Sequence, residues 1–221
     1  VFVVVAATLF FGTTIGTING VVTTLGKVTP FVVTLGMMSI ARGLAHIYTG
    51  GEPISGFNKP FRFIGSGEIF NVPVPIIVFG VTVLLAAAVL RHTILGRYMY
   101  AIGGNEEAAR LSGIPVLATK LLAYGASGFF CAIAGMCQAA QELQGDPEAG
   151  MTYELTAIAI VVIGGTNLMG GRGGIGLTFI GAMTIGYLEK ILSINAVGEA
   201  SRLMLTGVII VGAVLFQKFR R

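Results

Sequence analysis

Long apolar runs, separated by short polar segments and by Gly and Pro, dominate this chain of 221 residues. No Asp, Glu, Lys or Arg occurs in residues 1–26, in the 22 residues between Glu68 and Arg91, or in the 21 residues between Lys120 and Glu142. An α-helix rises about 1.5 Å per residue and needs roughly 20 residues to cross the hydrocarbon core of a bilayer. These runs therefore predict membrane-spanning helices.

Gly and Pro mark where the helices begin and end. Pro30 opens one run, Gly50-Gly51 closes it, and Pro73 opens the next. The later runs 155–171, 173–188 and 203–217 are short for a full crossing, so their helices either end below the interface or are broken and buried among others. The predicted fold is an all-α polytopic bundle of about six or seven transmembrane or half-spanning helices, in one domain over residues 1–221. We expect these helices at about 1–25, 31–49, 73–91, 119–141, 154–169, 175–193 and 203–217.

The composition supports a membrane protein. Only 11% of the residues are charged and 54% are hydrophobic, whereas about 25% of residues are charged in a typical soluble domain. A soluble fold of this composition would expose large apolar patches and aggregate.

The basic residues predict an orientation. If the segment 91–120 is cytoplasmic and each helix crosses once, nine of the 14 Lys and Arg residues face the cytoplasm, in agreement with the positive-inside rule. The C-terminus is then cytoplasmic. The sequence pI of about 9.3 follows from this topology and does not indicate nucleic-acid binding. The nine residues are Lys27, Arg91, Arg97, Arg110, Lys120, Arg172, Lys218, Arg220 and Arg221.

Few residues suggest catalysis or metal binding. Cys131 and Cys137 lie six residues apart in one predicted helix, on different faces, so they cannot pair within that helix. His46 and His92 are separated by a membrane crossing and have no further ligands near them in the sequence. The sequence contains no recognisable Ser-His-Asp set or metal cluster. We expect a transport subunit without a metal, and not an enzyme.

The predicted cytoplasmic loop, about 92–119, contains a small helix. Asn105 is a favourable N-cap residue, and Glu106 and Glu107 place negative charge on the first turn. Gly113 and Pro115 end the helix. A helix of about seven residues is unstable alone in water and needs a packing partner. Ala108, Leu111 and Ile114 form a small apolar face that suits a shallow groove on such a partner.

The same segment resembles a known family. Glu107-Ala108-Ala109, followed after three residues by Gly113, resembles the EAA-type coupling loop of ATP-binding-cassette importer permeases. The wider sequence is similar to the sugar-permease branch, of the ribose, xylose and galactofuranose type. The matching stretches follow the family's order and spacing over nearly the whole chain: 30–36, 96–97, 100–105, 108–114, 153–159, 162–166 and 170–173.

The resemblance implies a function and a set of partners. It implies the permease subunit of a sugar importer in the bacterial inner membrane, which works by alternating access. The partners would be an ATP-binding subunit that carries ATP and Mg, a periplasmic sugar-binding protein and a second permease chain, identical or not. This chain would hold no cofactor. The residues implied in coupling to the ATPase are Asn105, Glu106, Glu107, Ala108, Ala109, Arg110, Leu111, Gly113 and Ile114. The sugar itself is left open.

The family's upstream part has no counterpart in this sequence. Its members usually carry further helices there, with an acidic Gly-rich stretch. We therefore expect this chain to correspond to the C-terminal two-thirds of a permease.

Several polar or Gly residues are candidates for a substrate pathway or gate. The Gly pairs of 164–174 interrupt an apolar stretch without the Lys-Ser or Lys-Thr of a phosphate-binding loop, so nucleotide binding by this chain is not expected. They form either a broken helix beside the pathway or close helix contacts. A polar side chain in a membrane segment costs free energy unless it has a hydrogen-bonding partner or a function. Thr is less informative, because its hydroxyl can bond to the backbone of its own helix. The candidates are Thr34, Glu154, Thr156, Thr166, Asn167, Gly170, Gly171, Arg172 and Gly173.

A different class of protein remains as the alternative. A secondary transporter or channel for a small polar solute would need no ATP. It would be expected to carry an ion-coupling carboxylate inside the membrane, and none lies in the middle of a predicted helix.

Overall fold

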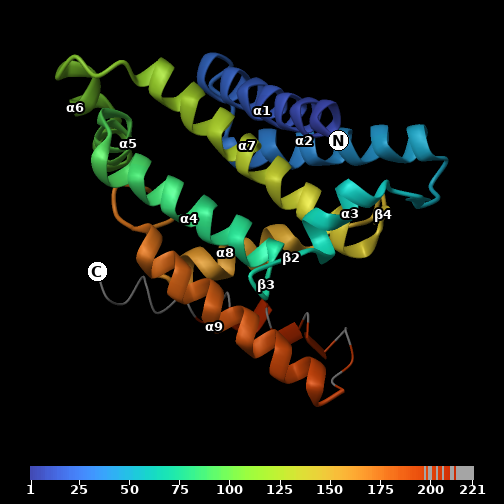
Figure 1. Cartoon of the computed structure of the whole chain (residues 1–221). Helices are drawn as coiled ribbons and strands as arrows, with labels where there is room; N and C mark the ends of the chain where they lie inside the picture. The colour runs from blue at the N-terminus through green and yellow to red at the C-terminus, as the bar shows by residue number, and fades with distance from the viewer. Residues whose placement is uncertain (197, 199–200, 203, 206, 210–211, 213–221) are drawn as a thin grey trace. The chain divides into compact units, whose positions relative to one another are not determined.

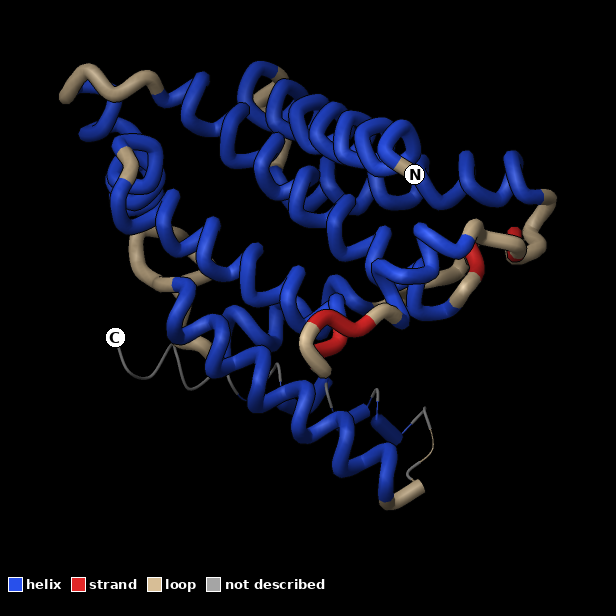
Figure 2. The backbone as a smooth tube through the Cα atoms, viewed as in Figure 1, coloured by secondary structure: helices blue, strands red, loops and turns tan. Residues whose placement is uncertain are grey.

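The computed structural model of the chain describes residues 1–196, 198, 201–202, 204–205, 207–209 and 212. The predicted helix at 203–217 lies in large part outside the described residues. Most of the described chain is helical, as Figure 2 shows. Within that part, five helices are long and apolar enough to cross a membrane: α1 (Phe2–Leu25), α2 (Pro30–Thr49), α4 (Val74–His92), α7 (Val116–Glu142) and α9 (Ile175–Ile194). The predicted all-α fold is confirmed.

Shorter elements connect these helices. They are α3 (Lys59–Ser66), α5 (Ile94–Gly104), α6 (Glu106–Leu111) and α8 (Tyr153–Ile163), with strands β1 (Ile54–Ser55), β2 (Glu68–Ile69), β3 (Val72–Pro73) and β4 (Gln144–Gly145). The strands form two antiparallel pairs, β1 with β4 and β2 with β3. The chain divides into two compact units. The first comprises Val1–Thr82 and Pro115–Ala149, and the second comprises Val83–Ile114 and Gly150–Arg221.

In the first unit α1 lies along α7 (Figure 1). Glycine makes this approach possible, because Gly12 and Gly16 face Gly128 of α7 backbone to backbone. A Cβ on Gly128 would overlap the carbonyl oxygen of Gly12. The hydrophobic effect contributes little to helix association inside a bilayer, because the lipid tails are themselves apolar. Helix interfaces in membranes are therefore often made of small residues that allow close van der Waals contact. The amphipathic helix α3 packs on α7 in the same way, with Gly65 against the backbone of Ala140.

The second unit contains the end of α4, then α5, α6, α8 and α9. Helices α8 and α9 pack side by side through glycine, and a Cβ on Gly164 would lie 2.7 Å from the carbonyl oxygen of Leu177. Residues 164–174 connect them, and we call this segment the glycine-rich loop. A second corner joins α4 to α5, where Thr93 caps α5 by accepting a hydrogen bond from the amide of Gly96 at 3.2 Å.

The structure corrects three of the expected boundaries. The helix expected at 154–169 ends at Ile163, because the chain turns at Gly165, where φ is +74°. Residues 94–104, which fall in the expected cytoplasmic loop, form a further helix, α5. The helix expected at 119–141 begins at Val116, directly after Pro115.

Candidate functional site

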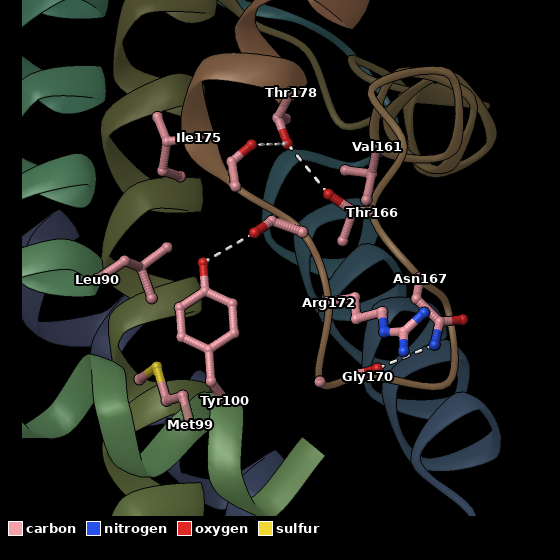
Figure 3. A pocket seen from close by; sticks show the side chains of 13 residues that line it. Leu90, Met99, Tyr100, Val161, Thr166, Asn167, Gly170, Arg172, Ile175 and Thr178 are labelled. Carbon is pink, nitrogen blue, oxygen red and sulfur yellow. Dashed lines mark hydrogen bonds between the residues drawn. The ribbon is translucent and has the colours of Figure 1, made fainter. Parts of the chain in front are cut away.

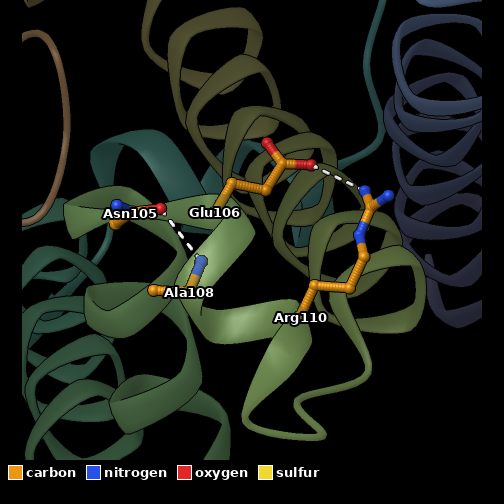
Figure 4. Close-up of polar contacts among 4 residues, drawn as sticks. All are labelled: Asn105, Glu106, Ala108 and Arg110. Atoms are coloured by element: carbon orange, nitrogen blue, oxygen red, sulfur yellow. Dashed lines mark hydrogen bonds and ion pairs between the residues drawn. The ribbon is translucent and has the colours of Figure 1, made fainter.

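Helix α6 forms as the sequence predicts. The side-chain oxygen of Asn105 accepts a hydrogen bond from the amide of Ala108 at 3.0 Å, so Asn105 is the N-cap (Figure 4). Glu106 and Arg110, four residues apart, form an ion pair at 3.3 Å. Both side chains are well exposed, so this pair contributes only about 0.3–0.5 kcal/mol. The cap determines where the helix begins, and the ion pair adds only this small stabilisation.

The C-terminal end of α6 is equally well defined. The amide of Gly113 donates to the carbonyl of Arg110 at 3.0 Å, and the amide of Ile114 donates to the carbonyl of Ala109 at 3.1 Å. Gly113 has φ +79°, a conformation that side chains with a Cβ rarely adopt. The predicted stop at Gly113 is therefore confirmed.

The two faces of α6 differ sharply. Ala109 is only 5% exposed, so its methyl group packs within the chain. Leu111 is 85% exposed and Ala108 is also exposed, whereas Ile114 is partly covered. Of the predicted apolar face, Leu111 is the largest side chain that is exposed. Ala109, which the sequence placed among the coupling residues, faces inward in this structure.

Helix α5 connects α6 to the glycine-rich loop. Gly103, near the end of α5, lies against Gly170 and Gly171, and a Cβ on Gly103 would overlap the amide nitrogen of Gly171. One turn earlier, the hydroxyl of Tyr100 donates a hydrogen bond to the carbonyl of Gly173 at 3.0 Å, 73 residues away (Figure 3). We call this set of contacts the glycine clasp. It holds the loop against the helix that leads directly into α6.

The loop can make this contact because of its glycines. Gly170, Gly171 and Gly173 all have positive φ, between +74° and +152°. A Cβ on Gly171 would lie 2.8 Å from the Cα of Gly104, so the conformation and the close approach both require glycine there. The structure thus supports close backbone packing for these glycines.

A cavity of about 350 Å³ adjoins the clasp. Leu90, Val161 and Tyr100 line its walls, together with the candidate residues Thr166, Asn167 and 170–173. The hydroxyl of Thr166 lies 3.4 Å from that of Thr178, which itself donates to the carbonyl of Gly174 at 3.2 Å. The structure therefore brings six of the nine predicted pathway residues together: Thr166, Asn167, Gly170, Gly171, Arg172 and Gly173.

The other three predicted pathway residues lie elsewhere. Thr34 is in α2, and its hydroxyl bonds to the carbonyl of Pro30 in its own helix at 3.1 Å. Glu154 and Thr156 lie in the first turn of α8 and do not line the cavity. An acidic residue at that position is favourable next to the positive end of the helix dipole.

Sequence reasoning missed two groups of residues. Tyr100 and Gly103 belong to the matching stretch 100–105, but the sequence does not single them out as site residues, because their contacts are with residues distant in the sequence. Asn19, Thr23 and Thr24 carry buried side-chain oxygens without a hydrogen-bond partner in the described chain. An Asn inside an apolar helix is costly and could have been noticed in the sequence.

No group of three or more His, Cys, Asp or Glu side chains in the described ranges could hold a metal ion. The clasp holds the glycine-rich loop against α5, and α5 leads directly into α6, the short helix that carries the exposed Leu111.

Comparison with known proteins gives a consistent set of relatives. Residues 1–214 match the family described as branched-chain amino acid transport system / permease component. The ribose import permease protein of Haemophilus influenzae is 40% identical over 99% of this chain and 69% of its own length. The corresponding protein of Escherichia coli K12 is 42% identical over 96% and 68%. The L-arabinose transport system permease protein of the same strain is 34% identical over 92% and 62%. No solved structure matches.

Proposed function

This chain belongs to the transport permease family described as branched-chain amino acid transport system / permease component, and we propose that it carries a sugar through the bacterial inner membrane as a subunit of an ATP-binding-cassette importer. It is a multi-pass transport subunit and not an enzyme. It spans about two thirds of the length of the ribose permeases that it matches.

Two observations support the proposal. The similarity to ribose and arabinose permeases covers nearly the whole chain, and α6, the helix of the coupling loop, is capped at both ends with Leu111 exposed. A six-residue helix that buries one face and presents an apolar side chain on the other is suited to dock on a protein partner. The partner that we propose is the ATP-binding subunit, which carries ATP and Mg.

The other proposed partners follow from the class of importer. A sugar-binding protein delivers the sugar from outside, and a second permease chain completes the pathway. We keep the six residues beside the cavity as candidates for the pathway or its gate, together with Thr34, Glu154 and Thr156. Hydroxyl and amide groups suit a neutral sugar, because such contacts are weak enough to allow release. In this structure the hydroxyl of Thr166 lies 3.4 Å from that of Thr178 in α9, and Asn167 bonds to Gly170 within the loop, so a sugar would compete with these contacts.

The glycine clasp suggests how docking is transmitted. A force applied to α6 acts on α5, since the two share Asn105 at their junction. The contacts of the clasp then transmit this force from α5 to the glycine-rich loop, which is continuous with α8 and α9. Coupling travels through contiguous packed elements of this kind when they have two arrangements. In this proposal the clasp links ATP-driven motion of α6 to two membrane helices.

Uptake experiments test the function directly. Proteoliposomes that contain the permease and its ATP-binding subunit should accumulate radiolabelled sugar, delivered by the binding protein, when hydrolysable ATP is enclosed. A non-hydrolysable ATP analogue should give none, because alternating access needs the energy of hydrolysis. Uptake that follows an ion gradient without ATP would instead support a secondary transporter.

The orientation is also a proposal. Helix α8 has 11 residues, about 16 Å, and is too short to cross a bilayer alone. The chain nevertheless returns to the side of the membrane on which α5 lies, because Gly170 and Gly171 pack against Gly103 at the end of α5. Arg172 then shares the cytoplasmic side with Arg110, as the positive-inside rule favours. One further crossing by α9 and one by the predicted helix 203–217, which falls largely outside the described residues, make the C-terminus cytoplasmic.

Thiol labelling checks this topology. Ser112 and Glu148 flank α7, which at 27 residues is long enough to cross the membrane. In a variant with Cys131→Ala and Cys137→Ala, a cysteine at position 148 should react in intact cells with a membrane-impermeant maleimide. A cysteine at position 112 should react only after permeabilisation. Labelling of position 112 from outside would reverse the orientation and remove the proposed docking site.

A further inference from the structure

The tip of the glycine-rich loop, residues 167–170, is a turn closed by several hydrogen bonds. The side-chain nitrogen of Asn167 donates to the carbonyl of Gly170 at 3.0 Å, and its side-chain oxygen accepts from the amide of Met169 at 3.2 Å. The backbone closes the same turn, since the amide of Gly170 donates to the carbonyl of Asn167 at 3.0 Å. The base of the turn is closed by the amide of Asn167 and the carbonyl of Arg172, at 2.9 Å. We call residues 167–170 the loop tip.

The loop tip presents two apolar side chains. Met169 is 80% exposed and Leu168 is 52% exposed. The hydrogen bonds of Asn167 hold the backbone that carries them, so little backbone freedom would be lost when another surface covers them. Exposed apolar side chains on a backbone that is already ordered are suitable anchors for a protein interface.

The loop tip lies at the same end of its unit as α6. The glycine clasp holds Gly170 and Gly171 against Gly103, three residues before α6 begins. In Figure 1 the glycine-rich loop and α5–α6 lie at the same end of α9. A molecule that docks on α6 therefore approaches the part of the unit that carries the loop tip.

Helix α6 by itself is too small for a stable interface. Its six residues extend about 9 Å, whereas a stable protein interface buries about 800 Å² on each partner and involves roughly 20–30 residues. Additional surface must come from segments beside α6. The loop tip supplies exposed apolar area there, on a segment that is already held in place.

We propose that the loop tip, through Met169 and Leu168, is a second contact surface for the ATP-binding subunit, beside α6. This inference rests on the proposed function. It gives the glycine clasp a further role, since the clasp keeps both contact surfaces in one fixed arrangement. The partner then holds α6 and the α8–α9 connection at the same time, and a movement of the partner acts on both.

Photo-cross-linking tests this surface in the assembled importer. The residue p-benzoylphenylalanine is introduced singly at position 169, at position 111 as the reference for α6, and at position 183 as the control. Met183 is 50% exposed in the middle of α9, where only lipid or another permease chain is expected. On irradiation in membranes, positions 111 and 169 should each give an adduct with the co-expressed ATP-binding subunit of the same importer, identified by mass spectrometry. Position 183 should give none.

The outcomes separate the two proposals. Adducts from position 111 but only lipid or permease–permease adducts from position 169 would overturn the second contact and leave the proposed function intact. The absence of ATP-binding-subunit adducts at both positions would contradict the proposed function itself. A binding assay completes the test. Met169→Glu should lower the amount of ATP-binding subunit that co-purifies roughly tenfold, whereas Met169→Leu should retain it. Equal co-purification by the two variants, at equal permease abundance, would overturn the inference.

Discussion

Sugar uptake by a Leu111→Glu variant should fall to background while the permease remains at its normal abundance in the membrane. Leu111 is 85% exposed and lies outside the membrane helices, so the substitution removes no packing within the chain. On docking, however, the new carboxylate would be buried against a surface that accepts an apolar side chain. An unpaired charge in an interface costs about 2 kcal/mol or more, which corresponds to at least roughly 30-fold weaker association.

Three measurements distinguish this result from a folding defect. Membrane abundance should be unchanged, co-purification of the ATP-binding subunit should drop, and sugar-stimulated ATP hydrolysis in the reconstituted complex should be lost. Leu111→Met is the matched control, because it keeps an apolar side chain of similar volume. Normal uptake by Leu111→Glu would show that α6 is not the docking helix.

The sequence predicts α6 well because its signals are local. Asn105 caps a helix that starts one residue later, and Gly113 supplies the left-handed conformation that ends it. Both depend on residues within a few positions of each other. The five long helices are predicted for a related reason, since apolar length alone determines whether a segment can cross a bilayer. Nothing distant in the chain is needed for either prediction.

Tertiary contacts account for what the sequence does not predict. The contact of Tyr100 with Gly173 joins residues 73 positions apart, and no local pattern reveals it. The early end of α8 has a similar cause. The helix expected at 154–169 runs six residues past Ile163, whereas in the structure Gly164 packs against α9 and the chain turns at Gly165. The same holds for Ala109, because the sequence shows a small residue in α6 without showing that it faces inward.

The role of the glycine clasp can be tested at two adjacent positions of α5. A Cβ on Gly103 would overlap the amide nitrogen of Gly171, whereas a Cβ on Gly104 would meet no atom within 4 Å. Gly103→Ala and Gly104→Ala add the same methyl group to neighbouring positions at the end of one helix. Both gain a similar, small amount of helix propensity, at most about 1 kcal/mol. The difference between the two variants therefore reports the contact with the glycine-rich loop.

Gly103→Ala should lower sugar uptake at least tenfold, and Gly104→Ala should leave it near the level of the unmodified protein. The added methyl group forces the loop away from α5, at a cost of about 1–3 kcal/mol for overpacking. Because α6 itself is unchanged, the ATP-binding subunit should still co-purify with the Gly103→Ala variant. ATP hydrolysis should persist at its basal rate but no longer respond to sugar, since the movement of α6 no longer reaches α8 and α9. Equal uptake by the two variants would mean that transport does not depend on the clasp, and that docking is transmitted through another part of the permease.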